Sequence, residues 1–272
     1  MIENISGVAR TAYYCCGVRA ADAGKREPIC GDHLASLFMD EAGQEVFGHF
    51  ADLRFPNASN ATRARIIDDW LRDRLLADPE QLVIFLGAGF DTRAFRLNGG
   101  RWVEVDEAGL IAEKERVLPA ARAPQPLTRL AVDFSAERLE DRLAPYEGEY
   151  PVIVMEGVSM YLSQAQLKST LSAVQWVFPR HTLICDLMRK AFAERYAAEL
   201  RKRLAALGTS FAELPADPVS AIAALGYRPI ARSSIMARAR ELGAVPFPKF
   251  LLNTLLRPLR DGYCAHVFEA GR

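Results

Sequence analysis

The sequence predicts an α/β fold in which a seven-stranded, mostly parallel sheet carries helices on both faces. Two observations support this prediction. Short apolar runs suited to buried strands alternate with segments of helical spacing, as in sheets built from strand–helix–strand units. One such run, residues 83–86, ends in Gly87-Ala88-Gly89, and a glycine turn after a buried strand is typical of the ligand-binding edge of a doubly wound sheet.

The size and charge of the chain limit its class. Its 272 residues, half of them hydrophobic, can bury one good core, so we expect a single domain. Lysine plus arginine equals aspartate plus glutamate at 34 each, which leaves no net charge to recruit nucleic acid or an anionic membrane. We find no leader peptide and no stretch of about eighteen apolar residues, and expect a cytoplasmic protein. The five cysteines lack the spacing of a disulfide framework or a zinc site, so no metal is expected.

Two or three helices should precede the sheet, because residues 8–50 place apolar side chains at helical intervals. Residues 57–60 resemble an N-terminal cap, after which a helix would carry Arg63 and Ile67 on one face. On that face Arg63 would extend toward the ligand-binding edge of the sheet. The alternative interpretation places Arg63 and Arg65 together on a solvated face beside two aspartates.

The glycine turn belongs to a strand–turn–helix unit. Helical spacing resumes near Thr92 and ends at residues 98–100, where Asn-Gly-Gly is a strong stop signal. A pyrophosphate-binding fingerprint needs a third glycine where this chain has Thr92, which weakens the case for a dinucleotide ligand.

The second strand, residues 102–106, ends in an acid. The carboxylate of Asp106 can accept hydrogen bonds from both hydroxyls of a ribose. Glu104 is a rival for this role, but Asp106 is favoured because it lies at the carboxyl end of the strand. The residues therefore favour an adenosine group without a diphosphate.

Two further strands also lead to acids. Asp133 and Phe134 follow the third strand, residues 127–132, and could bind the adenine amino group and cover the ring; Asp133 fits equally well as the N-cap of the next helix. The fourth strand, residues 151–155, ends in Glu156-Gly157. A carboxylate there is costly to bury unless a partner, such as a ligand ammonium or the amides of the turn, binds it.

The C-terminal part is expected to hold the remaining strands and an acceptor site. The fifth, sixth and seventh strands are predicted at residues 181–186, 228–232 and 263–269. A single charged helix over residues 190–207 should end at Gly208, and residues 209–217 should form a loop near the mouth of the acceptor site. About thirty apolar but irregular residues before the last strand are a candidate acceptor-binding insert.

Three segments, GAGFDTRAFRL, WVEVDEAGLIAEKERVL and VIVMEGVSMYLS, occur in an order that resembles the leucine carboxyl methyltransferase-like family of S-adenosylmethionine-dependent O-methyltransferases. The resemblance runs from about Val8 to the last strand and is faintest between Ala191 and Asn253. It implies a Rossmann-like class I methyltransferase fold with an N-terminal helical lid. The family includes enzymes that methylate a protein's C-terminal carboxylate and bacterial enzymes that methylate polyketides.

The resemblance also implies roles for single residues. S-adenosyl-L-methionine would lie against Gly87, Ala88 and Gly89, with its ribose on Asp106. Its adenine would contact Asp133 and Phe134, and its methionine end would contact Glu156 and Gly157. The pattern R-x-R-x-x-D-D favours Arg63 for the methionine carboxylate, with Arg65 as substitute, and Arg19 matches a second cation. Tyr161 would lie beside the sulfonium as the catalytic candidate, although an aromatic residue at this spacing also fits core packing. The lid would comprise residues 1–78, the cofactor-binding core residues 79–190, and the acceptor-site helices and last strands residues 191–272.

The expected activity is methylation of a carboxylate or hydroxyl of a small acceptor, a polyketide or aromatic acid of secondary metabolism, and the oligomeric state stays open. A carboxylate is already an anion and needs no base, whereas a phenol gains from a nearby histidine or acid. None of the four histidines belongs to a recognisable catalytic arrangement, which favours an acid acceptor. The alternatives are a protein C-terminal carboxyl methyltransferase, an NAD(P)-dependent oxidoreductase, and a cofactor-binding protein without catalysis.

Overall fold

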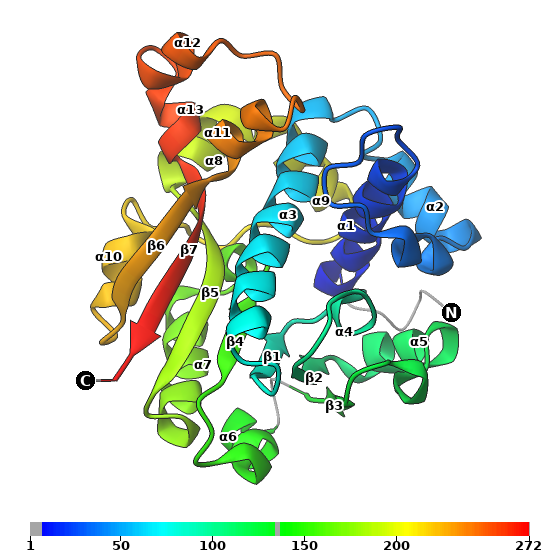
Figure 1. The fold of residues 1–272 in the computed structure, drawn as a ribbon. Helices are drawn as coiled ribbons and strands as arrows, with labels where there is room; N and C mark the ends of the chain where they lie inside the picture. Colours follow the sequence, from blue (N-terminus) through cyan, green and yellow to red (C-terminus); the bar gives the residue numbers. More distant parts are fainter. Residues whose placement is uncertain (1–6, 134–136, 272) are drawn as a thin grey trace.

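Seven strands form one sheet in the order β3-β2-β1-β4-β5-β7-β6, in which β7 alone runs antiparallel to the others (Figure 1). The computed structural model describes residues 7–133 and 137–271. Every predicted strand is present within two residues of its expected ends, which confirms the predicted fold class. The strands are β1 (Leu82–Leu86), β2 (Arg101–Asp106), β3 (Leu127–Ala131), β4 (Val152–Met155), β5 (His181–Met188), β6 (Arg228–Ser234) and β7 (Tyr263–Ala270).

Helices cover both faces of the sheet. On one face, α3 (Arg54–Ala77) packs Ile67, Leu71 and Leu75 against strand residues such as Phe85 and Val154. The opposite face is covered by α6 (Leu139–Leu143), α7 (Gln164–Val177) and α10 (Pro218–Ala223). Because side chains alternate along a strand, both sets of strand residues are buried, which explains the near-continuous apolar strand sequences.

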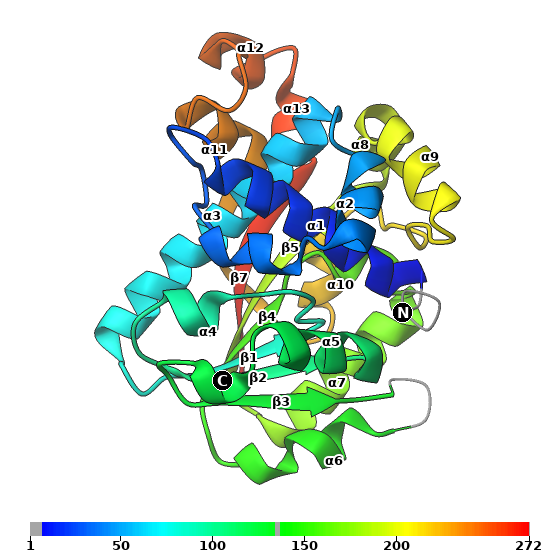
Figure 2. The same ribbon diagram turned by 90° about the vertical axis from the view of Figure 1, so that its right-hand side faces the viewer.

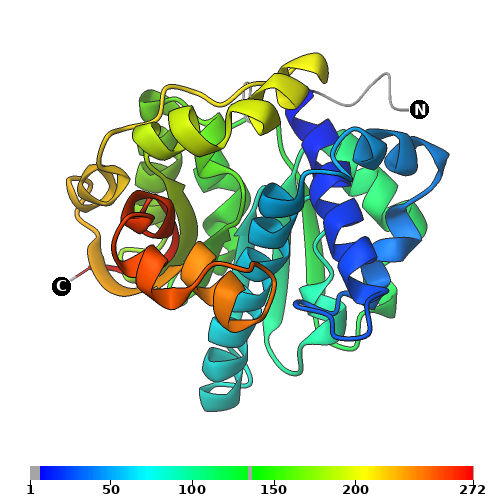
Figure 3. The same cartoon turned by 90° about the horizontal axis from the view of Figure 1, so that it is seen from above.

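The remaining helices gather mainly beyond the carboxyl ends of the parallel strands (Figures 1 and 2). Seen from above, α1 runs beside α3 (Figure 3). These helices are α1 (Gly7–Ala23), α2 (Glu41–Gly48), α4 (Arg93–Arg96), α5 (Ala108–Val117), α8 (Lys190–Tyr196), α9 (Ala198–Ala206), α11 (Ile235–Glu241), α12 (Lys249–Asn253) and α13 (Arg257–Asp261). Over the described ranges, no helix is both long and apolar enough to cross a bilayer.

The predicted cap at residues 57–60 is wrong, because α3 begins at Arg54 and these residues lie inside it. The Asn57 amide explains the error. Its Nδ2 donates to the carbonyl oxygens of Phe50 and Ala51, at 2.9 and 3.2 Å, and its Oδ1 accepts from the hydroxyl of Tyr14. The polar side chain therefore binds the preceding loop and α1, where the sequence pattern indicates a cap of its own helix.

Two other local predictions are also corrected. The single helix expected over residues 190–207 is two helices separated at Ala197, which is buried. The insert before β7 is not irregular but contains α11, α12 and α13, whereas the helix predicted after the glycine turn is present as the short helix α4. The N-cap role of Asp133 stays a prediction, because the residues that would begin its helix lie outside the described ranges; its backbone N–H donates to Oε1 of Glu137 at 3.2 Å. Phe134 lies outside the described residues.

A buried aspartate fastens α3 to the segment after β1. Asp68 is fully buried, and its carboxylate accepts from Nε of Arg93 at 2.5 Å and from Nη1 of Arg96 at 2.9 Å. Burial by itself would raise the pKa of Asp68, but the two guanidinium groups outweigh it and hold the pKa below its usual value. The next residue, Asp69, is partly exposed and pairs with Arg65 and Arg72 at the helix surface.

These adjacent aspartates give a matched stability test. Asp68→Ala should lower the free energy of unfolding by about 3–5 kcal/mol, because it removes a buried carboxylate that two buried guanidinium groups share. Asp69→Ala should change it by less than about 1 kcal/mol, because its ion pairs are exposed to solvent. Urea denaturation of the two variants measures both values. Similar losses in both would show that the Asp68 pairs do not anchor α3.

Candidate active site

The turn after β1 depends on glycine. Gly87 and Gly89 adopt φ values of +76° and +47°, which L side chains rarely adopt. A Cβ on Gly87 would lie 2.5 Å from Cγ2 of Val158. The backbone N–H groups of Gly87 and Ala88 both donate to the carbonyl of Val105, at 2.9 and 3.2 Å, so the turn folds back onto β2. This geometry agrees with the positive φ values expected from the sequence.

Asp106 lies at the end of β2, directly against this turn. Its Oδ2 accepts from the N–H of Gly89 at 2.6 Å, and its Oδ1 accepts from the N–H of Glu107 at 2.7 Å. Each carboxylate oxygen has about two lone-pair positions, so both oxygens keep acceptor capacity. Burial raises the pKa of Asp106, with the two backbone hydrogen bonds acting in the opposite direction. The rival Glu104 is buried between Lys114 and Arg129, at 2.8 and 2.9 Å.

Arg63 extends from α3 to the carboxyl edge of the sheet, as its helical spacing predicts. Its Nε donates to Oε1 of Glu156 at 3.0 Å, and its Nη1 donates to the hydroxyl of Tyr263 at 2.8 Å and to Oδ2 of Asp186 at 3.2 Å. Because only 6% of Arg63 is exposed, the alternative of a solvated face is wrong for this residue. The solvated-face interpretation is correct for Arg65, which is partly exposed and pairs with Asp69.

Glu156 and Gly157, at the end of β4, complete this cluster. The Glu156 carboxylate is also paired with Nη2 of Arg93 at 2.8 Å. Burial alone would raise the pKa of Glu156, but Arg93 and Arg63 hold it below its usual value. The N–H of Gly157 donates to Oδ1 of Asp186 at 2.6 Å, and Gly157 has a φ of +70°. The acid at this strand end is therefore satisfied by two arginines, not by the amides of its own turn.

The cation of α1 lies on the other side of the glycine turn. Arg19 is buried; its Nε donates to Oδ2 of Asp32 at 2.9 Å, and its Nη2 donates to the carbonyl of Phe90 at 2.7 Å. The Phe90 ring packs between Tyr13 and Phe38, at 4.7 Å from each ring centre. Arg19 therefore ties α1 to the turn and does not line the cavity described next.

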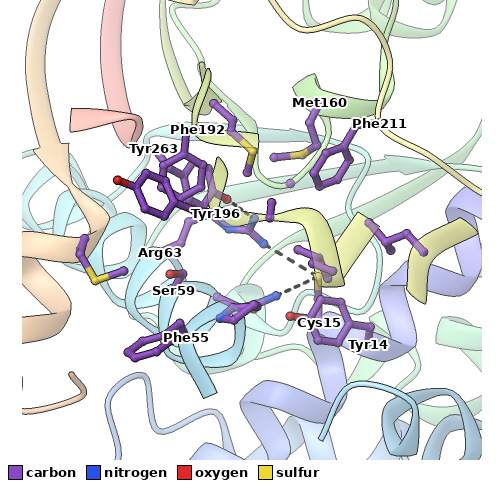
Figure 4. A pocket seen from close by; sticks show the side chains of 18 of the residues that line it. Tyr14, Cys15, Phe55, Ser59, Arg63, Met160, Phe192, Tyr196, Phe211 and Tyr263 are labelled. Carbon is purple, nitrogen blue, oxygen red and sulfur yellow. Dashed lines mark hydrogen bonds between the residues drawn. The ribbon is translucent and has the colours of Figure 1, made fainter. Parts of the chain in front are cut away.

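An apolar cavity of about 90 Å³ lies beside Arg63 and Gly157 (Figure 4). Helices α1, α3, α8, α9, α11 and α13 all contribute to its walls. Its aromatic and methionine side chains are Tyr14, Phe55, Met160, Tyr161, Met188, Phe192, Tyr196, Phe211, Met236 and Tyr263. The volume is below the roughly 300–1,000 Å³ of ligand pockets, so a bound ligand requires these side chains to move, and methionine adapts readily.

Two buried polar atoms of the cavity residues have no hydrogen-bond partner among the described residues. They are the hydroxyl of Tyr196 and Oδ1 of Asn60. Each such group costs about 1–3 kcal/mol of desolvation that no hydrogen bond returns. A ligand with its own polar groups would satisfy them.

Tyr161 lies on the short 3₁₀ helix Ser159–Tyr161 after β4 and lines the same cavity. Its ring contacts Phe211 edge-on at 5.6 Å, so it also packs against the loop after α9. Burial raises the pKa of Tyr161, which keeps its hydroxyl protonated at neutral pH. Tyr161 therefore makes the packing contact that its spacing also fits, and its place beside the sulfonium stays a prediction.

Comparison with known proteins decides the family. The sequence profile named leucine carboxyl methyltransferase matches residues 12–175, more than half of the chain. The chain belongs to this family. The family predicted from the three sequence segments is thereby confirmed, and S-adenosyl-L-methionine is the cofactor of its methyltransferases. An NAD(P)-dependent oxidoreductase is excluded by the same finding.

Curated relatives resemble this chain over about two thirds of their length. A protein of Parafrankia sp., provisionally named as an S-adenosyl-L-methionine-dependent methyltransferase, is 31% identical over 72% of this chain and 68% of its own. The tetracenomycin polyketide synthesis O-methyltransferase of Streptomyces glaucescens is 25% identical over 67% of this chain and 66% of its own. A DUF574 family crystal structure from Streptomyces avermitilis, 11% identical, superposes with a TM-score of 0.59 over 94% of this chain and 97% of that one, which supports the fold.

Three residues of the arginine cluster were not singled out by the sequence. Asp186 ends the stretch predicted as the fifth strand, and the argument used for Glu156, that an acid after a buried strand needs a partner, would have found it. Arg93 and Tyr263 carry no such signal, because the partners that join them to this cluster, Glu156 for Arg93 and Arg63 for Tyr263, are distant in the sequence.

The glycine turn can be tested with a matched pair of substitutions. Gly148 also has a positive φ, +87°, but a Cβ there would meet nothing within 4 Å. Gly148→Ala should therefore cost only the conformational strain, about 1–2 kcal/mol. Gly87→Ala should cost about 1–3 kcal/mol more, because the new Cβ displaces Val158. Urea denaturation of both variants measures the difference, and equal losses would contradict the close approach to Val158.

Proposed function

We propose that this methyltransferase transfers the methyl group of S-adenosyl-L-methionine to an oxygen of a small, largely aromatic acceptor, and that the oxygen belongs to a carboxylate. The product would be a methyl ester. The observation that carries the proposal is the composition of the cavity beside Arg63 and Gly157. Its described lining contains aromatic and methionine side chains but no histidine, aspartate or glutamate.

The described residues fit the cofactor that the family uses. The glycine turn exposes bare backbone, and Asp106 beside it keeps lone pairs for two ribose hydroxyls. Arg63 supplies a cation for the methionine carboxylate, and Glu156 with the turn at Gly157 supplies the acceptor for its ammonium. We assign Arg19 a positioning role, because it holds α1 against Phe90 at the turn. Asp133 and Phe134 stay proposed for the adenine.

The cofactor supplies an electrophilic methyl group, and the residues of the chain place the acceptor oxygen in line with it. Met160, Met188 and Phe192 exclude water from the cavity, while Tyr161 and Tyr263 border its edge near the strand ends. The orphaned Tyr196 hydroxyl and Asn60 oxygen offer a donor and an acceptor to an oxygenated ring. Tyr161 stays neutral and acts by packing and by orienting the acceptor.

The missing base favours a carboxylate over a phenol. All four histidines lie away from the cavity: His33 and His49 are exposed, and His181 is bound to the Phe178 carbonyl and the Tyr227 hydroxyl. His266 lies on the other face of the sheet. A carboxylate is ionised at neutral pH and needs no proton acceptor, whereas a phenol must lose its proton to react well.

The relatives support a small acceptor. The tetracenomycin relative is named for O-methylation in polyketide synthesis, and its similarity covers about two thirds of each chain. A polyketide or aromatic acid of secondary metabolism therefore suits the aromatic cavity. The family name also keeps a protein C-terminal carboxylate as the second candidate.

Two substitutions separate the ends of the cofactor. Asp106→Asn should weaken both S-adenosyl-L-methionine and adenosine by about tenfold or more, because both carry the ribose. Arg63→Lys should weaken S-adenosyl-L-methionine by a similar factor and leave adenosine unchanged. Isothermal titration calorimetry measures all four affinities, with Arg65→Lys as the control that changes neither ligand. Equal losses of both ligands in Arg63→Lys would show a general collapse of the site.

The pH dependence of cofactor binding follows from Asp106. Because burial raises its pKa, the carboxylate gains a proton at a higher pH than an exposed aspartate does. Affinity for adenosine should therefore fall as the pH falls through this raised pKa, and Asp106→Asn should remove that dependence.

The acceptor class is tested by methyl transfer from labelled cofactor to aromatic acids, matched phenols and short C-terminal peptides. We expect base-labile methyl esters from the aromatic acids, at a rate that is flat between about pH 6.5 and 9 because the carboxylate is ionised throughout. Transfer to phenols with a rate that rises with pH would overturn the carboxylate assignment. Transfer to peptides alone would favour the protein acceptor.

A further inference from the structure

A second cavity lies on the opposite face of the sheet from the acceptor cavity. In the antiparallel pair of β5 and β7, Asp186 lies opposite Ala265, and Cys185 lies opposite His266. Because successive side chains alternate, His266 points away from the face that carries Asp186 and Arg63. His266 lines a groove of about 410 Å³ with Leu187, Arg189, Arg232 and the start of α10. This volume falls within the usual range of small-ligand sites.

His266 is a buried polar side chain without a hydrogen-bond partner among the described residues. It is only 5% exposed, and its ring stacks on Phe268 at 5.7 Å. The other buried histidine, His181, has both ring nitrogens bonded, at 2.8 and 3.0 Å. The ring nitrogens of His266 are not among the fully buried polar atoms that lack a partner, so they are accessible from the groove that this residue lines.

Charged side chains of both signs line the groove. Arg189 faces Asp217 across 3.6 Å, a distance longer than a hydrogen bond. Arg232 donates to Asp261 at 2.6 Å, but the same carboxylate is also paired with Arg257 and Arg260. The lining of the groove itself contains two arginines and two aspartates, and the Asp261 carboxylate is shared with Arg257 and Arg260, which lie outside the lining.

The neighbouring arginines affect the pKa of the His266 imidazole. Burial, together with Arg232 and Arg189, lowers the pKa of His266 to about 4, so the ring is neutral at pH 7. The titratable and charged groups around it are Arg189 after β5, Arg232 on β6, Asp217 before α10, Asp261 at the end of α13, and the thiols of Cys185 and Cys264. A bound anion would oppose the arginines and raise this pKa.

We propose that this groove is a second ligand site, separate from the methyl-transfer site, that binds the oxyanion group of a small metabolite, a phosphate or a carboxylate, through Arg189, Arg232 and His266. An oxyanion accepts charge-assisted hydrogen bonds from both guanidinium groups and one from the ring N–H. The groove is larger than a bare inorganic ion needs, so it has room for the body of the metabolite beside the apolar side chains of Leu187 and Ile230.

Sulfate tests the site, because its charge is constant across the pH range used. The ring resonances of His266 are followed by NMR in the full chain while sulfate replaces chloride at constant ionic strength. We expect a saturable shift of His266 and a rise of its pKa by about one unit or more. The exposed His33 and His49 serve as internal references. A response of His266 no larger than theirs would overturn the proposal.

The variants identify the ligating groups. Arg189→Gln and Arg232→Gln should each weaken sulfate by about tenfold, the value of one lost charge-assisted hydrogen bond. Arg228→Gln, on the same edge strand but paired with Glu269 outside the groove, should change nothing. Sulfate affinity should rise as the pH falls in the native chain and be flat in His266→Gln. Equal affinity in all four variants overturns the site.

Two further measurements complete the test. Affinity for S-adenosyl-L-methionine should be unchanged in Arg189→Gln, which separates this groove from the proposed methyl-transfer site; a loss of cofactor affinity would overturn the separation. The affinities of methyl phosphate and acetate then distinguish the two oxyanion sources. The compound that binds more tightly identifies the metabolite as a phosphate or a carboxylate. If neither methyl phosphate nor acetate displaces sulfate, the groove does not bind the oxyanion group of a metabolite, and the proposal is wrong.

Discussion

The carboxylate of Glu156, held between Arg63 and Arg93, is the interaction on which the carboxyl edge of the sheet depends. Arg63 comes from α3, Arg93 follows β1, and Glu156 ends β4, so one buried acid joins three elements. Burying these charges is costly, and a buried ion pair adds little net stability compared with a well-packed apolar cluster. The ion pairs instead restrict geometry. Each buried charge needs its partners, so the three elements can pack only in the arrangement that brings those partners together. The cluster thereby fixes α3 relative to the glycine turn.

The strands and the glycine turn could be predicted because their signals are local. A run of buried side chains followed by glycine needs no distant partner to be recognised, and the rule that ligands bind beyond the carboxyl ends of strands placed Asp106 and Glu156 at one edge. Helix limits were less predictable. Asn57 has the composition of a cap, yet its amide binds the loop before α3 and the hydroxyl of Tyr14. Only the tertiary fold brings those partners within reach.

The candidate site shows the same division. Helical spacing was enough to direct Arg63 to the sheet, and the family pattern pointed to Tyr161. For the walls of the cavity, the sequence predicted only two segments, a loop after α9 and an insert before β7, and no single residue within them. Phe211, Met236 and Leu259 do line it from those segments. No motif marks these residues, because an apolar side chain that faces a ligand has the same sequence signal as one that faces the core.

The position of β7 has a consequence for the order in which the protein can be completed during synthesis. β6 pairs within the described sheet only with β7, and β7 lies between it and β5. β6 therefore leaves the ribosome before its pairing partner, and both of its edges stay unpaired until residues 263–270 have emerged. Tyr263, which binds Arg63 and Asp186, arrives in the same step. The nascent chain thus closes its polar cluster and its sheet in the same step.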